Sequence, residues 1–353
     1  MNLGRHLFSS ARTYARASAR SRRGRASAAR WLFVSLAATL LAAFAYTGAA
    51  LAQENYPNRA VRMIVPWPPG QATDLGGRLV AQYLSDAFGK PVVPDNRPGA
   101  GGMIGTDVVA KSAPDGYTLL AASSGPITIS PLLQKTAYDV DRDFVPVAKI
   151  GVSPYVLVTA TSFPAANARE FVALLRSNPG KYSFASSGVG ASAHLITEWF
   201  NNTAGLQVTH VPYKGSSQAL SDVMSGQVAY AIETAAAVMP LVRSGRLKAY
   251  GVSLAKGSAM TPGVEPFASG ANMPGFDVGG WMGVMVPAGT PKAIVDRLAS
   301  AIDTAMQKPE ARERLNALGF EVDYRRPDDF ARDLKFQQTR FGEIIKKGNI
   351  KIE

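Results

Sequence analysis

The chain has 353 residues, a formal net charge of +12 and no cysteine. The lack of cysteine excludes disulfides, thiolate nucleophiles, thiolate metal sites and a lipid-anchored cysteine. Residues 1–52 hold eight Arg and no acidic residue, so the rest of the chain has 30 basic and 26 acidic residues, a balance of +4. This small surplus argues for neither nucleic-acid nor membrane binding, and it suits small acidic ligands.

Residues 1–52 have the pattern of a secretory signal peptide. The eight Arg lie within residues 1–30, an apolar run of about 16 residues follows, and Ala50-Leu51-Ala52 is a small-x-small cleavage site. The run is short for a membrane span, which needs about 20 residues. Arg22-Arg23 leaves the twin-arginine route open, although the residues after the pair favour the general secretory route. We predict export and cleavage near Ala52; the long basic segment leaves the true start codon open.

The remaining chain alternates strands with amphipathic helices, which is typical of an α/β fold with mostly parallel sheets. We expect residues 255–278 to form a loop. The predicted strands are 61–65, 91–93, 117–122, 155–160, 182–185, 207–211, 228–233, 247–253 and 281–286. The predicted helices are 74–88, 103–112, 167–177, one that follows Ser192, 217–225 (capped by a serine), 291–307, 309–318 and 327–346.

About 300 residues is the size at which a single core tends to split. We therefore predict two lobes that are discontinuous in sequence. Lobe 1 comprises residues 53–154 and 279–353, and lobe 2 comprises residues 155–278. Two crossovers, near residues 150–156 and 278–284, join them.

Three segments rich in Gly, Ser, Thr and Pro each lie between a strand and a helix start: 67–74, 186–192 and 212–217. Ligands of open α/β sheets sit above such strand ends, and the unpaired N–H groups at helix starts favour anions. One such segment could be an ordinary turn, but the repetition in both lobes predicts a cleft. Backbone N–H groups and the hydroxyls of Thr73, Ser187 and Ser192 would recognise a carboxylate there without Arg.

Other chemistry finds little support in the sequence. A dinucleotide fingerprint in residues 99–105 would need Gly where Ile104 stands, and no phosphate-binding P-loop occurs. We read residues 97–105 as a structural turn and helix start, with Arg97 as a solvated or paired charge. No nucleophile elbow surrounds Ser187 and no zinc spacing appears, so we predict no catalytic residue, metal or cofactor.

Four further residues leave two interpretations open. His194 either faces the cleft or packs in the core, whereas His210 favours a structural role. Glu233, at a strand end, either binds a ligand ammonium or hydroxyl group or is an exposed acid. Trp67 either forms a wall of the pocket or belongs to the core, as does Trp281.

Several ordered motifs resemble the Bug family, the periplasmic solute-binding proteins of tripartite tricarboxylate transporters in Bordetella-like bacteria. The resemblance covers essentially the whole chain after the leader and continues through Trp281 and residues 287–291. The motifs are Pro66-Trp67-Pro68-Pro69-Gly70 with Asp74, Asn96-Arg97-Pro98-Gly99-Ala100-Gly101-Gly102, Pro114-Asp115-Gly116-Tyr117-Thr118-Leu119-Leu120, and His210-Val211-Pro212-Tyr213-Lys214-Gly215.

The resemblance implies a two-lobed, type II periplasmic-binding-protein fold that closes around a small carboxylate without catalysis. It also implies a monomer whose partners are transporter membrane subunits or a sensor domain, with no nucleic acid. Carried over by residue, it places Gly70, Ala72, Thr73, Ser187, Gly188 and Gly190 in the pocket. With the neighbouring residues, the full predicted ligand-binding set is Trp67, Gly70, Gln71, Ala72, Thr73, Ser123, Ser187, Gly188, Val189, Gly190, Ala191, His194 and Glu233.

Four positions depart from the family pattern. The family usually has Gly at Gln71, Ser at Ala191, often Asp at Glu233, and Asn at Ser130. These departures leave the identity of the ligand open. The alternatives are an exported α/β hydrolase that uses Ser187 and His194, or a ligand-loaded signalling partner of a sensor protein.

Overall fold

The computed structural model describes residues 56–347 and 350. The predicted signal peptide, residues 1–52, lies outside the described residues. From Pro57 onwards the chain forms one compact unit. Among the described residues, no helix has both the length and the hydropathy that a membrane crossing requires.

Two groups of strands share one long strand, β4 (Phe144–Ala160). The described strands follow the order β2-β1-β3-β9-β4-β7-β5-β6, and β10 and β8 also pair with β4. The first group contains β1 (Val61–Val65), β2 (Val92–Asn96), β3 (Thr118–Ser123), β9 (Gly279–Pro287) and β10 (Glu321–Arg325). The second contains β5 (Ser183–Ser186), β6 (Thr209–Pro212), β7 (Tyr230–Thr234) and β8 (Leu247–Val252).

Strand β4 changes partners between Pro154 and Tyr155. Residues 144–154 pair with β9, whereas the strand pairs with β7 from Tyr155 and with β8 from Val156. β1 and β5 pair in parallel with their neighbours, as the alternating pattern predicts, while β4 and β9 run antiparallel to theirs. The sheet is therefore mixed: β4 and β9, which cross between the two strand groups, run antiparallel to their neighbours, unlike the parallel strands of βαβ units.

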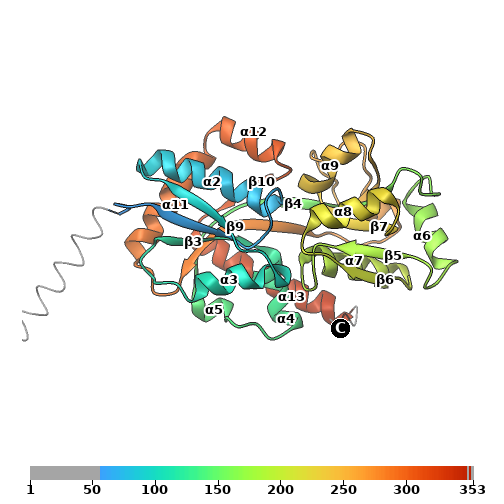
Figure 1. Ribbon diagram of the computed structural model, residues 1–353, viewed down its shortest axis with the longest axis horizontal. Coiled ribbons are helices and arrows are strands. Elements are labelled where there is room, and N and C mark those ends of the chain that lie inside the picture. The colour runs from blue at the N-terminus through green and yellow to red at the C-terminus, as the bar shows by residue number, and fades with distance from the viewer. Residues whose placement is uncertain (1–55, 348–349, 351–353) are drawn as a thin grey trace, which may run out of the picture. The chain divides into compact units, whose positions relative to one another are not determined.

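Helices cover both faces of each strand group (Figure 1). Around the first group lie α2 (Ala72–Phe88), α3 (Met103–Ala110), α4 (Ser130–Leu133), α5 (Val140–Asp143), α11 (Lys292–Met306), α12 (Pro309–Ala317) and α13 (Pro327–Lys347). Around the second lie α6 (Ala168–Arg176), α7 (Ser192–Ala204), α8 (Ser216–Ser225), α9 (Ala235–Arg243) and the short α10 (Phe267–Gly270). Two single turns, η1 (Ala100–Gly102) and η2 (Gly125–Ile129), precede α3 and α4.

Most of the predicted elements are present, with bounds that differ by a few residues. The sequence analysis missed the first half of β4, which prolines and glycines interrupt, and β10, which has no fully buried residue. It also missed α9, an alanine-rich segment that contains Pro240. The predicted serine cap of the helix at 217–225 is wrong, because α8 begins at Ser216 and Gly215 occupies the capping position without a side-chain hydrogen bond.

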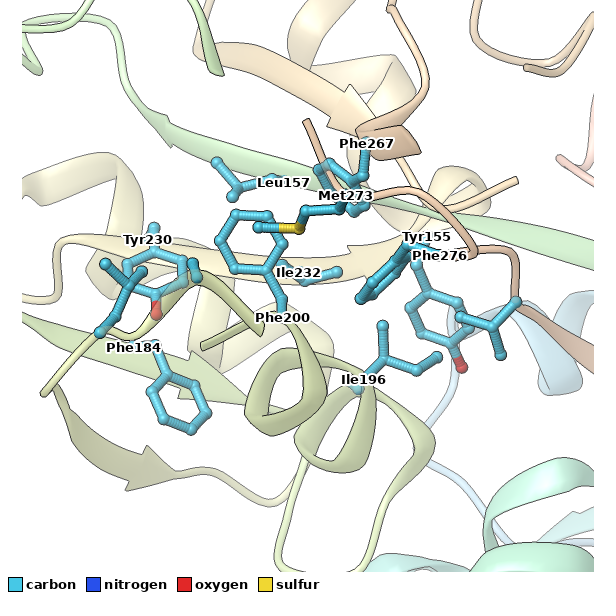
Figure 2. Close-up of a cluster of buried hydrophobic side chains, with 14 of the residues drawn as sticks. Tyr155, Leu157, Phe184, Ile196, Phe200, Tyr230, Ile232, Phe267, Met273 and Phe276 are labelled. Carbon is cyan, nitrogen blue, oxygen red and sulfur yellow. The ribbon is translucent and has the colours of Figure 1, made fainter. Parts of the chain in front are cut away.

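An aromatic core fills one face of the second strand group. Figure 2 shows Phe200, Phe267 and Phe276 converging there, and the ring centroids of Phe267 lie 4.9 Å from Phe200 and 5.3 Å from Phe276. Two residues from α13, Phe341 and Ile344, belong to the same cluster. The C-terminal part of α13 thus packs on the second strand group, while Phe330 near its start packs with the first.

A buried ion-pair network holds the start of α13 against β4. The side chain of Lys149 is 2% exposed, and its Nζ lies 2.7 Å from Asp333 Oδ2 and 2.8 Å from Asp323 Oδ2. Arg325 completes the network at 3.3 Å from Asp333 and 3.1 Å from Asp323. Removing one member of such a network leaves the other charges buried without full compensation, and this lowers the stability of the folded protein.

We expect Lys149→Met to lower the free energy of unfolding by about 3 kcal/mol in urea denaturation, because two carboxylates lose their shared buried cation. The control is Lys292→Met, whose partner Asp296 lies at the surface of α11 with a side chain that is 55% exposed. That variant should change stability by less than about 1 kcal/mol. Equal effects of the two substitutions would contradict this account of the network.

Candidate ligand-binding site

A cavity lies where the two strand groups meet. The space between its walls amounts to about 450 Å³, open solvent at its mouth included. Its lining comes from strand ends and helix starts of both groups: Trp67, Gln71, Ala72, Thr73, Ser123, Ser124, Ser153, Tyr155, Ser187, Ser192, Ala193, Ser216, Glu233, Thr234, Gly280, Trp281 and Phe320.

The loop between β1 and α2 is held by a buried carboxylate. Asp74 accepts hydrogen bonds from the Gly70 amide at 2.9 Å and from Asn96 Nδ2 at 2.8 Å, and Arg78 pairs with it at 2.9 Å. Burial alone would raise the pKa of Asp74, but these hydrogen bonds together lower it. The loop that carries Trp67 is thereby fixed, since Asn96 also donates to the Trp67 carbonyl at 2.8 Å.

Hydroxyl groups gather on one side of the cavity. Trp67 Nε1 donates to Ser123 Oγ at 2.9 Å, so the Ser123 proton is left to donate elsewhere. The Oγ atoms of Ser124 and Ser192 lie 2.8 Å apart and join the two strand groups. Tyr155 lines the cavity beside them, and burial raises the pKa of its phenol, which stays a neutral donor.

A second set of polar groups surrounds Glu233, which is 1% exposed. Gln71 Nε2 donates to Ser216 Oγ at 2.9 Å, and Ser216 Oγ donates to Glu233 Oε2 at 2.9 Å. The Thr234 amide also donates to Oε2, at 3.2 Å. Burial raises the pKa of Glu233, while hydrogen bonds from Ser187, Ser216 and Thr234 oppose the rise. Glu233 is therefore not the exposed strand-end acid that one interpretation allowed.

Helix N-termini supply the positive potential of the cavity. The starts of α2, α7 and α8 contribute Ala72, Ser192 and Ser216 to its walls. Their first-turn N–H groups lack helical partners, and the helix dipoles favour an anion there. None of the described residues that line the cavity is Lys, Arg or His, and Glu233 is the one acid among them. The described residues contain no cluster of His, Asp and Glu that could hold a metal ion.

The cavity contains seven residues of the predicted set, all from strand ends and helix starts: Trp67, Gln71, Ala72, Thr73, Ser123, Ser187 and Glu233. The other six, Gly70, Gly188, Val189, Gly190, Ala191 and His194, lie outside its lining. Five of them belong to the loops that precede α2 and α7, and His194 lies in the first turn of α7.

The loop 187–191 packs against η1 of the first strand group. A Cβ on Gly101, whose φ is +62°, would lie 2.7 Å from the Val189 carbonyl oxygen. Ser130 Oγ donates to the Gly190 carbonyl at 3.0 Å, which adds a buried polar contact between the same regions. Arg97 pairs with Asp95 at 3.2 Å, and residues 97–105 form a turn, η1 and the start of α3, as predicted.

His194 and His210 stack on each other, outside the cavity lining. Their ring centroids lie 4.0 Å apart, and the His210 ring also stacks on Phe184 at 4.7 Å. His194 Nδ1 accepts from the Gly190 amide at 3.3 Å, and His210 Nε2 lies 2.7 Å from Ser186 Oγ. Burial lowers the pKa of His194 to about 3 and that of His210 to about 4. The stack therefore supports the loop 187–191 with neutral rings.

Several lining residues escaped the sequence analysis. Ser124, Ser153 and Tyr155 follow or belong to strands, and Phe320 precedes β10, which was not predicted. Tyr155 is the first residue of the predicted apolar strand 155–160. Only the pairing with β9 and β7 shows that the chain passes from one strand group to the other at this residue. Trp281 and Gly280 reach the cavity from the second crossing strand, β9.

Comparison with known proteins gives the family. The family model described as "Tripartite tricarboxylate transporter family receptor" matches residues 77–350. The chain belongs to this receptor family. It is 37% identical to Protein BugT of Bordetella pertussis over 307 residues, 86% of this chain and 94% of that protein. It is 36% identical to a UPF0065 protein of Pseudomonas sp. strain P51, over 83% of this chain and 87% of the relative.

Solved structures of relatives share the fold. Rpa4515 of R. palustris, a structure with adipate, has a TM-score of 0.81 at 31% identity and covers 84% of this chain and 99% of its own. MatC of Rhodopseudomonas palustris, with bound malate, has a TM-score of 0.78 at 31% identity over 82% of this chain and 100% of its own. The periplasmic binding protein BugD has a TM-score of 0.80 at 32% identity, over 84% and 100%. The two-lobed periplasmic-binding-protein fold expected from the resemblance is confirmed.

The histidine stack makes stability depend on pH. Both pKa values are lowered in the folded protein, so the unfolded chain binds protons first as the pH falls below about 6.5. Each histidine should remove about 1.5 kcal/mol of folding free energy between pH 6.5 and pH 5. We expect His210→Asn to be less pH-sensitive than the parent protein in urea titrations at these two pH values. Identical pH slopes would contradict the assignment.

The Gln71–Ser216 hydrogen bond joins loops from the two strand groups, and Gln71→Ala should loosen them. Loss of a hydrogen bond of about 1 kcal/mol predicts about fivefold faster amide hydrogen exchange in residues 212–217. Gln227→Ala, at an exposed position after α8, serves as the control. Unchanged exchange in Gln71→Ala would show that the contact does not hold the loops together.

Proposed function

We propose that this protein captures a small carboxylate between its two lobes and delivers it to the membrane subunits of a tripartite tricarboxylate-type transporter. One observation carries the proposal. The described lining of the cavity combines helix N-termini with the hydroxyls of Ser123, Ser124 and Ser192 and contains no cationic side chain. Such a set of neutral donors stabilises a carboxylate by hydrogen bonds and dipoles. Adipate and malate in structures of two relatives support the same ligand class.

We also propose how the chain is processed and divided. Residues 1–52 act as a signal peptide that is cleaved near Ala52 and sends the protein to the periplasm, in keeping with the periplasmic relative BugD. Lobe 1 comprises residues 53–154 and 279–353, and lobe 2 comprises residues 155–278. The change of partners along β4 between Pro154 and Tyr155 supports the first boundary, and the start of β9 at Gly279 supports the second.

No catalysis is part of this proposal. Ser187 lies beside the Glu233 carboxyl. This position argues against a catalytic pair of Ser187 and His194. His194 uses Nδ1 to accept from the Gly190 amide, and its Nε2 lies 3.9 Å from Glu198. A general base must reach the nucleophile's proton, and Nδ1 of His194 already accepts from the Gly190 amide. The protein would act as a monomer that binds neither nucleic acid nor a cofactor.

The test is a thermal-shift and calorimetric screen of residues 53–353 against mono-, di- and tricarboxylates, acidic amino acids and aromatic acids. A ligand at 100 times its Kd should add about 2.7 kcal/mol and raise Tm by a few degrees. Ser192→Ala should weaken binding of the best ligand about tenfold, because a hydrogen bond to a charged group is lost. Ser225→Ala, on the exposed side of α8, is the matched control.

Two results would contradict the receptor function. The first is a folded protein that responds to no carboxylate in the screen. The second is hydrolysis of an ester or amide that Ser187→Ala abolishes, which would favour the hydrolase alternative. Weaker binding in Ser187→Ala without any turnover supports the receptor.

A further inference from the structure

The two strand groups also touch each other outside the cavity. Ser130 Oγ donates to the Gly190 carbonyl at 3.0 Å, and a Cβ on Gly101 would lie 2.7 Å from the Val189 carbonyl oxygen. Gly101 belongs to η1 and Ser130 begins α4, whereas Val189 and Gly190 lie in the loop between β5 and α7. These four residues form the outer contact between the strand groups, and all four lie outside the described lining of the cavity.

The outer contact brings one backbone directly against another. A Cβ on Gly101 would also lie 3.2 Å from the Ala191 amide nitrogen, so only glycine at this position lets the loop approach so closely. Ser130 is fully buried, and its hydroxyl satisfies the Gly190 carbonyl. The donor and the acceptor both belong to the protein, so the outer contact does not depend on what the cavity holds.

Gly101 and Val189 follow strands that lie away from the crossing between the groups. Gly101 follows β2, the end strand of the first group, and β1, β3 and β9 separate β2 from β4 in the strand order. Val189 follows β5, and β7 separates β5 from β4. If one strand group rotates about the crossing strands, the parts furthest from the crossing move most. Opening of the cavity would therefore break the outer contact.

We propose that the outer contact holds the protein closed before a carboxylate arrives, so that a carboxylate enters only through a transient open form. This inference rests on the proposed receptor function and concerns how its cavity is reached. Because its residues lie outside the lining, the outer contact stabilises the closed form equally with and without a bound carboxylate. Weakening the contact then speeds entry and release by the same factor and leaves Kd unchanged.

A contact that forms only around a bound carboxylate would behave differently. The protein would then be open before binding, and weakening the contact would leave the association rate constant unchanged. Only the dissociation rate constant would rise, and Kd would rise with it. The association rate constant therefore separates the two cases, and a loss of general stability does not imitate its increase.

The first test is stopped-flow kinetics with malate and adipate as probes. Ser130→Ala removes the hydrogen bond of the outer contact and should raise both rate constants about fivefold, with Kd unchanged within about twofold. Ser112→Ala is the matched control, because its hydroxyl donates to the Val108 carbonyl within the same strand group, and it should change neither rate. Faster dissociation of Ser130→Ala with an unchanged association rate constant overturns the inference.

The second test measures closure without any carboxylate. The chain has no cysteine, so Asp86→Cys on α2 and Ser221→Cys on α8, both at exposed positions, can carry a pair of spin labels for a distance measurement. The otherwise unchanged protein should give one distance, which malate and adipate leave as it is. Gly101→Ala should add a longer distance, because its Cβ would overlap the Val189 carbonyl.

Gly205→Ala is the matched control for backbone strain. Gly205 has a φ of +64°, close to the +62° of Gly101, but a Cβ there would meet no atom within 4 Å. This variant should keep the single distance. A long distance in the otherwise unchanged protein that shortens with malate or adipate overturns the inference, as does a Gly101→Ala protein as closed as Gly205→Ala.

The distance measurement also separates this inference from the receptor function. A closed protein that responds to no carboxylate in the thermal-shift screen contradicts the receptor function and supports the outer contact as the cause of closure, provided that Gly101→Ala opens it. An open protein that binds carboxylates supports the receptor function and overturns the inference. Ser130→Ala in the labelled protein replaces Gly101→Ala if the latter does not fold, and it should add the same longer distance.

Discussion

The antiparallel pairing of β4 with β9 is the constraint on which the rest of the structure depends. β4 pairs with β9 as far as Pro154 and then continues into the second strand group. The two crossing strands supply part of the cavity lining: Ser153 and Tyr155 come from β4, and Gly280 and Trp281 come from β9. β3 is the neighbour of β9 and β7 is the neighbour of β4, so the ends of both strands lie beside the crossing. The cavity is therefore a consequence of topology.

The second organising feature is that the described cavity wall attracts anions without any positive side chain. Helix N-termini and hydroxyls are neutral, so they need no buried counter-ion when the cavity is empty of ligand and their geometry is held by the backbone. Buried charge is used elsewhere, where it is compensated within the protein: Asp74 by Arg78 and Asn96, and Lys149 by Asp323 and Asp333. Glu233 is the exception, because hydroxyl and amide groups, among them Ser216 Oγ and the Thr234 N–H, hydrogen-bond its buried carboxyl.

The departures from the family pattern acquire structural roles. Gln71 bridges to Ser216 and so links the first loop to the carboxyl of Glu233. Ser130 donates to the Gly190 carbonyl and helps to fix the loop behind the cavity. Ala191 occupies the capping position of α7 without a side-chain hydrogen bond, which leaves the first N–H groups of that helix without an internal partner. The contacts of Gln71 and Ser130 join loops of the two strand groups around the cavity.

The sequence by itself determined the α/β class, the order of most strands and helices, and the loops that line the cavity, because periodicity and Gly/Pro punctuation are local signals. It identified Trp67, Gln71, Ser187 and Glu233 as candidates for the same reason. Only the tertiary structure decided that His194 stacks on His210, that Tyr155 and Trp281 line the cavity, and that Ser216 donates to Glu233. These facts depend on pairing between β4, β7 and β9, whose partners are far apart in the chain, and no local pattern encodes such a pairing.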